Sequence, residues 1–132
     1  MSNIAIGIDQ LSAAVSNELT VYADNVIDGV KREAQKSMRN LVTETKATAP
    51  VGHRRAKHYR DSIASKKTEE TAQSVTYTWY VKGSDYRLSH LLEDGHAKRN
   101  GGRVEGTHFI RKASISIIED YEKAVEEVVR RG

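Results

Sequence analysis

The sequence predicts an α+β fold, with a long N-terminal helix and a C-terminal helix packed on a small antiparallel β-sheet. Three patterns predict it. Apolar residues recur at steps of three and four over residues 8–48, alternate with polar residues over residues 74–81, and return to the helical spacing over residues 114–130. A length of 132 residues is typical of one domain, so we expect residues 1–132 to form a single domain.

The first helical segment is long for a chain of this size. Its pattern covers residues 8–48, and the only proline of the sequence, Pro50, follows it. A continuous helix of this length would measure about 60 Å, whereas a domain of this size has a radius of gyration of about 14 Å. Either the helix breaks near Asn25–Gly29, where helix propensity is weak, or it is continuous and projects to pack on neighbouring subunits.

A hairpin is predicted in the middle of the chain. SVTYTWYV (74–81) carries apolar side chains on one face, which is typical of an antiparallel strand covered on one side. IASKKT (63–68) is its weaker partner, and residues 69–73 form the connecting loop. Upstream of the hairpin, HRRAKHYR (53–60) is predicted as an exposed loop or short helix, because half of its residues are Lys or Arg.

A short helix is predicted over YRLSHLLE (86–93), with Ser84 or Asp85 as its cap. The core candidates in this helix are Tyr86, Leu88, Leu91 and Leu92.

The last third of the chain predicts a second hairpin and a second long helix. Asn100-Gly101 is a turn signal, with strands at about 95–99 and 103–108. Phe109 is expected to fill the core where the helix over residues 114–130 begins. The buried stripe of that helix is predicted to consist of Ile115, Ile118, Tyr121, Val125 and Val128.

Composition excludes several classes of protein. The sequence has no cysteine, which excludes disulfides and thiolate metal sites and suits a reducing compartment. No apolar run approaches the roughly 20 residues that cross a bilayer, and the N-terminus lacks the pattern of a signal peptide. We therefore expect no membrane association.

Charge is distributed unevenly along the chain. Residues 1–30 carry four acids and no Lys or Arg, whereas residues 31–60 carry nine Lys and Arg against two acids. Such segregation is typical either of nucleic-acid contact or of head-to-tail pairing between identical subunits. The overall charge of +3 is small for a dedicated nucleic-acid binder, which favours subunit pairing.

Side chains that are able to bind a metal ion gather between residues 90 and 108, namely His90, Glu93, Asp94, His96 and His108. In helical zinc sites two histidines lie four residues apart on one face, whereas His90 and His96 lie six apart, which turns the second ring away. The glycine-rich phosphate-binding patterns are absent, and no serine has the setting of a catalytic nucleophile. We expect no metal, no cofactor, no small-molecule substrate and no enzymatic activity.

Two basic loops, 53–60 and 98–103, keep a second function open. The first combines positive charge with a tyrosine, a mixture typical of contacts to phosphates and bases. The alternative function is therefore a small basic DNA-binding module. The candidate contacts, to DNA or to a neighbouring subunit, are Arg54, Arg55, Lys57, Arg60, Lys98, Arg99 and Arg103.

Four short motifs follow one another along the chain. The long helix ends in ATAPVG (47–52), which contains Pro50, and YRDSI (59–63) leads into the first strand. LEDG (92–95), with Glu93 and Gly95, ends the short helix, and THFIRKA (107–113), with Phe109, opens the last one. In their order and spacing these motifs resemble those of the tail-completion, or head–tail joining, proteins of long-tailed bacteriophages, the small neck proteins.

The resemblance covers roughly residues 8–130, with two departures in the last motif. The family usually has Pro-Phe, an apolar residue and Arg-Pro-Ala there, whereas this chain has His108 and Lys112 in place of the prolines. The resemblance implies a structural protein of the virion neck or tail, made in the cytoplasm of the bacterial host. Its implied partners are further copies of itself, in a ring or other homo-oligomer, and the neighbouring neck and tail proteins, with contact to the genomic DNA left open.

Overall fold

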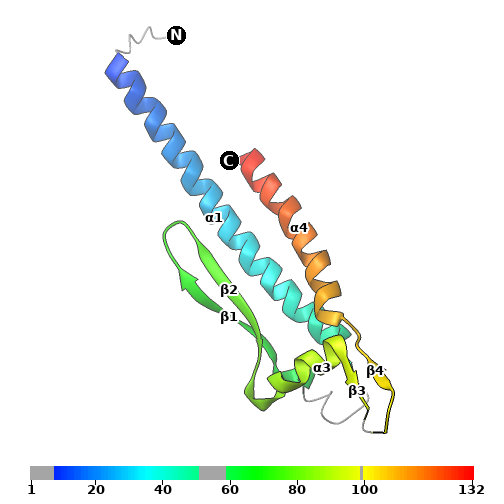
Figure 1. Cartoon of the computed structure of the whole chain (residues 1–132). Helices are drawn as coiled ribbons and strands as arrows, with labels where there is room; N and C mark the ends of the chain where they lie inside the picture. Colours follow the sequence, from blue (N-terminus) through cyan, green and yellow to red (C-terminus); the bar gives the residue numbers. More distant parts are fainter. Residues whose placement is uncertain (1–7, 51–58, 99) are drawn as a thin grey trace.

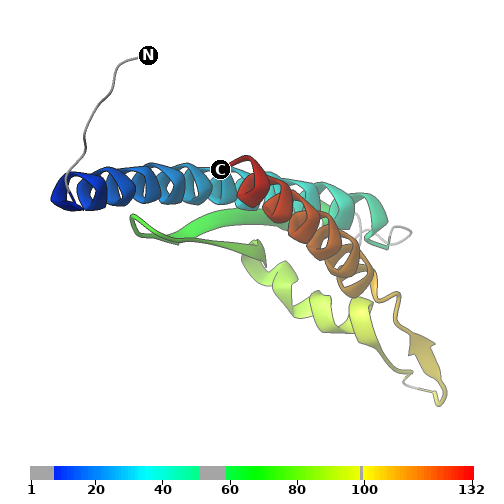
Figure 2. The ribbon, with the colours of Figure 1, turned by 90° about the horizontal axis from the view of Figure 1, so that it is seen from above.

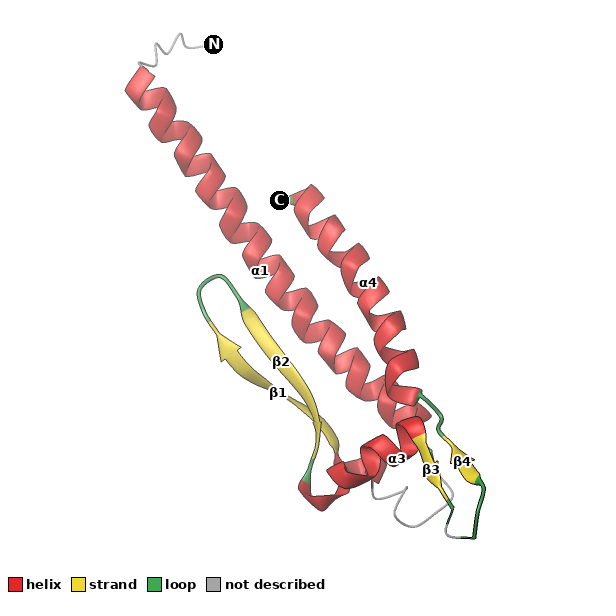
Figure 3. Cartoon of the chain, in the orientation of Figure 1, coloured by secondary structure: helices red, strands yellow, loops and turns green. Residues whose placement is uncertain are grey.

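The computed structural model describes residues 8–50, 59–98 and 100–132. The predicted α+β fold is confirmed, and helices make up most of it (Figures 1 and 3). Among the described residues, no helix is both long and apolar enough to cross a lipid bilayer. The elements follow in the order α1 (Ile8–Thr48), β1 (Ile63–Glu70), β2 (Val75–Val81), the 3-10 helix η1 (Gly83–Leu88), α3 (Ser89–Asp94), β3 (Gly95–Ala97), β4 (Arg103–Glu105) and α4 (Phe109–Arg131).

Helix α1 is continuous over 41 residues, so the expected break near Asn25–Gly29 is wrong. The alternative, a continuous helix, is the one observed, and its packing on neighbouring subunits stays a prediction. The weak propensity of Gly29 is offset by packing. Gly29 is buried, and a Cβ at this position would lie 2.5 Å from Cγ1 of Val128 on α4. Glycine therefore lets the two helices approach closely, and this contact supports the segment that propensity alone would interrupt.

The hairpin of β1 and β2 is antiparallel and pairs Ile63 with Val81 at one end and Glu70 with Val75 at the other. Strand β1 extends two residues beyond its predicted end because the Thr71 N–H donates to the Ser74 carbonyl at 2.9 Å and closes a tight turn. This confirms the predicted hairpin with a shorter loop.

Lys31 joins the tip of this hairpin to α1. Its Nζ lies 3.2 Å from Oε2 of Glu70 and also donates to the Thr71 carbonyl. Hydrogen bonds from Lys67 and from Lys31 hold the pKa of Glu70 below its ordinary value. Both partners of this ion pair are exposed enough that we expect it to align the hairpin more than to stabilise the fold.

The predicted short helix forms as two successive pieces, η1 and α3. Its N-cap is Lys82, without a side-chain hydrogen bond, so the predicted cap by Ser84 or Asp85 is wrong. The Asp85 carboxylate instead accepts a hydrogen bond from the Ser62 hydroxyl at 2.8 Å. Leu88 and Leu92 pack against the core as predicted, whereas Tyr86 is 58% exposed.

The second hairpin also forms, but its strands β3 and β4 have three residues each and form a sheet separate from that of β1 and β2. Helix α4 begins at Phe109, five residues earlier than predicted, and Phe109 and Ala113 are its buried residues. Ile115 and Ile118 were predicted to be buried, yet each is 54% exposed. The buried face of α4 is therefore rotated away from both isoleucines.

The hydrophobic core lies at the C-terminal end of α1. The buried residues of this core are Ala49, Tyr59, Ile63, Val81 and Phe109, with Val42, Trp79, Leu88, Leu92 and Ile110 packed around them. Inside it the Thr45 hydroxyl, fully buried, accepts a hydrogen bond from the Trp79 Nε1–H at 2.9 Å and ties β2 to α1. Figures 1 and 2 show the consequence for shape, because the N-terminal half of α1 extends beyond both the hairpin and α4.

Candidate functional site

Glu93 is the centre of the joint between α3 and α4. Its Oε1 accepts a hydrogen bond from the Ile110 N–H at 2.8 Å, and its Oε2 accepts one from the Arg111 N–H at 3.0 Å. These N–H groups belong to the first turn of a helix, where no intrahelical partner is available. Glu93 therefore caps α4 with a carboxylate at the positive end of the helix dipole.

The backbone closes the same joint. The Thr107 N–H donates to the Leu92 carbonyl at 2.9 Å, and the His108 N–H donates to the Glu93 carbonyl at 3.0 Å. The Thr107 hydroxyl donates to the Leu92 carbonyl as well, at 3.0 Å. The end of α3 is thus fastened to the residues that open α4, although 15 residues of chain separate Leu92 from Thr107.

Two glycines make this close approach possible. A Cβ at Gly106 would collide with the backbone of Glu93 and Asp94. At Gly95 φ is +83°, a conformation that favours glycine, and a Cβ there would collide with the Val104 carbonyl. The LEDG motif is therefore a structural joint in which the acid caps a helix and the glycine fits a strained turn.

Phe109 and Tyr59 form the packed centre beneath the joint. Their rings meet edge to face, with centroids 6.1 Å apart and planes at 84°, and the two side chains are 2% and 0% exposed. Burial raises the pKa of the Tyr59 hydroxyl, and a 2.9 Å hydrogen bond with the Ser89 hydroxyl partly offsets this. Because Ala49 lies in the same cluster, all four resemblance motifs meet here.

His108 has a left-handed backbone conformation. Its φ of 53° is the one positive value among the described residues that are not glycine. Its buried Nδ1 has no hydrogen-bond partner within the described part of the chain. A proline, the usual residue of the resembled motif, fixes φ near −65° and has no N–H, so it could not take this conformation.

Replacing Glu93 by alanine is expected to lower the free energy of unfolding by about 1–2 kcal/mol, because two N–H groups of α4 lose their acceptor. The midpoint of urea unfolding measures this. The matched control is Glu105→Ala at an exposed position of β4, which we expect to shift stability by less than about 0.5 kcal/mol. Equal effects of the two substitutions would contradict the capping role of Glu93.

The possible metal ligands of the sequence do not converge. Within the described ranges, no group of three His, Asp or Glu side chains is arranged to hold a metal ion. Glu93 is used as a helix cap, and His90 and His96 are exposed.

The basic candidates fall into two groups. Arg54, Arg55, Lys57 and Arg99 lie outside the described residues. Of the others, Arg60 precedes β1, Lys98 lies at the tip of the second hairpin, and the Arg103 guanidinium donates to the Asp94 carbonyl at 2.7 Å. Arg103 therefore fastens β4 to the end of α3, a role that the charge pattern did not predict.

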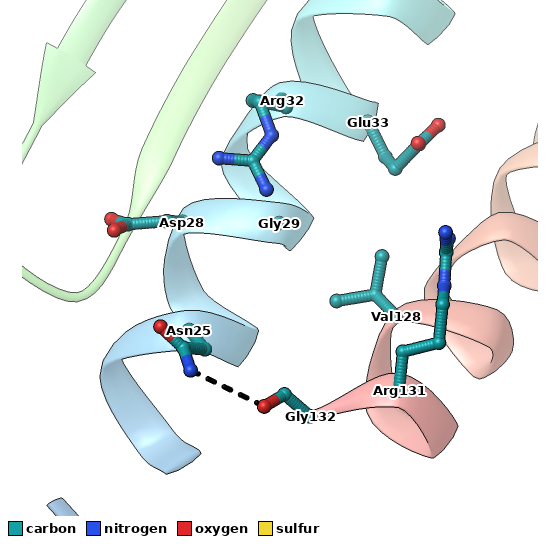
Figure 4. Close-up of a pocket in the computed structure, with 8 residues that line it drawn as sticks. All are labelled: Asn25, Asp28, Gly29, Arg32, Glu33, Val128, Arg131 and Gly132. Atoms are coloured by element: carbon teal, nitrogen blue, oxygen red, sulfur yellow. Dashed lines mark hydrogen bonds between the residues drawn. The ribbon is translucent and has the colours of Figure 1, made fainter. Parts of the chain in front are cut away.

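A polar cavity of about 390 Å³ lies between α1 and the end of α4 (Figure 4). On its edge the Asn25 amide donates to the Gly132 carbonyl at 3.3 Å, and the nearby Tyr22 hydroxyl donates to the Val129 carbonyl at 2.9 Å. Its charged lining consists of Asp28, Arg32, Glu33 and Arg131. Two acids and two bases balance, so the cavity has no net preference for a charged ligand.

An apolar groove runs along α1 between the hairpin and α4. It consists of two adjoining cavities of about 220 and 350 Å³ that share Ala34, Val75 and Tyr121. Its floor is formed by α1 from Val26 to Leu41, and Ile118 of α4 lines one wall. The sequence analysis did not predict this groove. A signal was present, because the last helix carries more apolar residues than packing against α1 alone would cover.

No curated protein and no solved structure matches the chain. One family model does, over residues 13–95, which is more than half of the chain and includes most of α1, the first hairpin and α3. The family is described as "Bacteriophage HK97-gp10, putative tail-component". The chain belongs to this HK97-gp10-like family of bacteriophage tail components.

Proposed function

We propose that the protein acts at the junction of the phage head and tail, as a tail-completion or head–tail joining protein. It works by assembly of subunits and not by catalysis, without a cofactor or small-molecule substrate. The proposal refines the structural tail role of the family to which the chain belongs.

The projecting half of α1 carries this proposal. Leu11, Val15 and Leu19 are 54%, 49% and 62% exposed, although they belong to one apolar stripe of the helix. A contiguous exposed apolar surface is typical of a site that is covered by another protein. A subunit of a multi-component joint needs such a surface, whereas a free-standing enzyme does not.

The proposed partners are further copies of this chain and the neighbouring neck and tail proteins. We infer that residues 1–132 act as one domain, made in the cytoplasm of the bacterial host and built into the neck of the virion. Within each subunit, Glu93 and Gly95 hold the joint and Phe109 fills the core, while Pro50 follows the C-terminal end of α1.

Deletion of the gene from the phage tests this function. We expect DNA-filled heads and separate tails in electron micrographs of lysates, with joining restored when the wild-type protein is supplied in trans. Normal numbers of joined particles from the deletion phage would show that the protein has another role.

Contact with DNA is the second candidate function. The exposed basic side chains of Arg32, Lys36 and Arg39 on α1 favour it, together with the two basic loops. The proposed loop contacts are Arg54, Arg55, Lys57, Arg60, Lys98 and Arg99, and Arg103 is less suited because it is bound within the chain. A gel shift at low and moderate salt tests it, since phosphate contacts weaken steeply with salt. Binding that is absent, or unchanged when Arg54 and Arg55 are replaced by alanine, rules the loop contacts out.

A further inference from the structure

The projecting half of α1 carries a ridge, which we define as Leu11, Val15 and Leu19. The spacing of four residues places the three side chains on one face of the helix. Farther along α1, the same face is covered by α4, whose end contacts Tyr22 and Gly29. The ridge is therefore a continuation of a packing surface beyond the point where α4 ends (Figure 1).

Like the ridge, the apolar groove is exposed to solvent in the described part of the chain. The hairpin and α4 flank the residues of α1 that line the groove, between Val26 and Leu41, and leave these residues partly exposed. The rim of the groove on α4 is apolar too, because Ile118 is 54% exposed, and Ile115 beside it is equally exposed. One chain thus carries both an apolar ridge and an apolar groove that residues 8–50, 59–98 and 100–132 leave unfilled.

Ridge and groove match at a defined axial offset. The ridge is centred on Val15 and the groove on Ala34, 19 residues farther along the same helix, or about 28 Å. A second copy displaced by this offset would place its Leu19 at the level of Met38, which lines the same cavity as Ile118.

The distribution of charge along α1 favours a similar axial offset between the α1 helices of two copies. Residues 8–30 carry four acids and no base, whereas residues 31–48 carry five bases and two acids. Two copies side by side in register would bring like charges together, which is unfavourable. A displacement of about 20 residues brings the acidic half of one α1 beside the basic half of the next, so charge and apolar matching select the same arrangement.

We propose that the ridge of one subunit docks in the apolar groove of the next, with a second copy of this chain as the occupant. This inference rests on the proposed function, from which it takes the assembly of identical subunits. Because ridge and groove are different surfaces, each subunit offers one of each, and the contact is heterologous. Such contacts build a ring when the rotation closes and a filament when it does not.

Single substitutions test the two surfaces by sedimentation of the purified full chain. We expect Leu19→Glu on the ridge and Ile118→Glu in the groove each to raise the concentration for half-assembly about 30-fold or more, because each would bury a charge in an apolar contact. The matched control is Val21→Glu. Val21 is 55% exposed on the same helix but about 200° away from Leu19, so assembly should be unchanged.

Mixing the two defective variants distinguishes the proposed contact from pairing of ridge with ridge. The Leu19→Glu chain keeps its groove and the Ile118→Glu chain keeps its ridge, so together they should form a complex of one copy each and stop there. If Ile118→Glu alone assembles like the wild type, or the mixture stays monomeric, the docking proposal is wrong.

Crosslinking extends the test to the assembled virion, where partner proteins are present. The chain has no cysteine, so a Leu19→Cys, Ile118→Cys double variant has two thiols of known position. Within one chain Leu19 lies 19 residues of α1, or about 28 Å, from Met38, which lines the same cavity as Ile118, so the two thiols are too far apart for a disulfide. We expect a ladder of disulfide-linked multimers on oxidation, and none from a Val21→Cys, Ile118→Cys control.

The crosslinking and deletion experiments separate the two proposals. Absence of the ladder from virions overturns the docking, even if the deletion phage fails to join heads to tails. A ladder together with normal joining in the deletion phage keeps the docking and removes the proposed function.

Discussion

Replacement of Phe109 by alanine is expected to lower the free energy of unfolding by about 3–5 kcal/mol. The side chain is 2% exposed and lies where α4, α3 and the segment before β1 meet, so the cavity left behind would border several elements at once. The edge-to-face contact with Tyr59 would be lost as well, a term of about 0.5–1.5 kcal/mol. A loss of this size is a large fraction of the roughly 5–15 kcal/mol that stabilises a typical domain.

Urea unfolding followed by circular dichroism measures this change, with two controls in the same chain. Phe109→Leu keeps an apolar side chain and should cost clearly less than the alanine variant. Tyr86→Ala removes an aromatic ring that is 58% exposed and should change stability by less than about 1 kcal/mol. If Phe109→Ala is no worse than Tyr86→Ala, Phe109 does not anchor the core.

Periodicity predicted the long elements well, because each repeats its pattern over many residues. The helical character of residues 8–48 and the hairpin of β1 and β2 both follow from spacing. Spacing could not decide whether α1 breaks at Gly29, since that depends on Val128, 99 residues away in sequence. A glycine that weakens a helix locally stabilises it here through a tertiary contact.

The start of α4 shows the same limit. Local pattern placed it at Ser114, whereas the helix begins at Phe109. Its cap is the side chain of Glu93, 17 residues before Ile110, and no local rule assigns a cap across a whole hairpin. Glu93 was recognised as part of a motif, but its role became apparent only with its two hydrogen bonds in place.

A projecting helix was one of two alternatives that the sequence left open, but neither the exposed ridge nor the groove was predicted. A helical wheel reports how wide an apolar stripe is and not which part of it the chain itself covers. Ile115 and Ile118 belong to the apolar stripe of the last helix, yet they face solvent beside the groove. The proposed assembly surface therefore depends on packing angles between helices, which periodicity leaves undetermined.

Replacement of His108 by proline is expected to destabilise the protein by about 3 kcal/mol or more, although proline is usual at this place in the resembled motif. Proline would force φ from +53° to near −65° and remove the N–H that donates to the Glu93 carbonyl. The path of the backbone from β4 into α4 would have to change, and Glu93 would lose its position against Ile110.

His108→Gly is the matched control, since glycine takes a left-handed conformation without strain and keeps the N–H. We expect its stability to stay within about 1 kcal/mol of the wild type, because relief of left-handed strain offsets the entropy of a more flexible unfolded chain. A proline variant as stable as the wild type would mean that the joint enters α4 by the path of the family motif. A strong loss of stability in the proline variant alone would mean that the backbone of this chain enters α4 by a different path from that of the family motif. In this path the Glu93 carbonyl binds the N–H of the left-handed His108, and the Glu93 carboxylate caps the helix that follows.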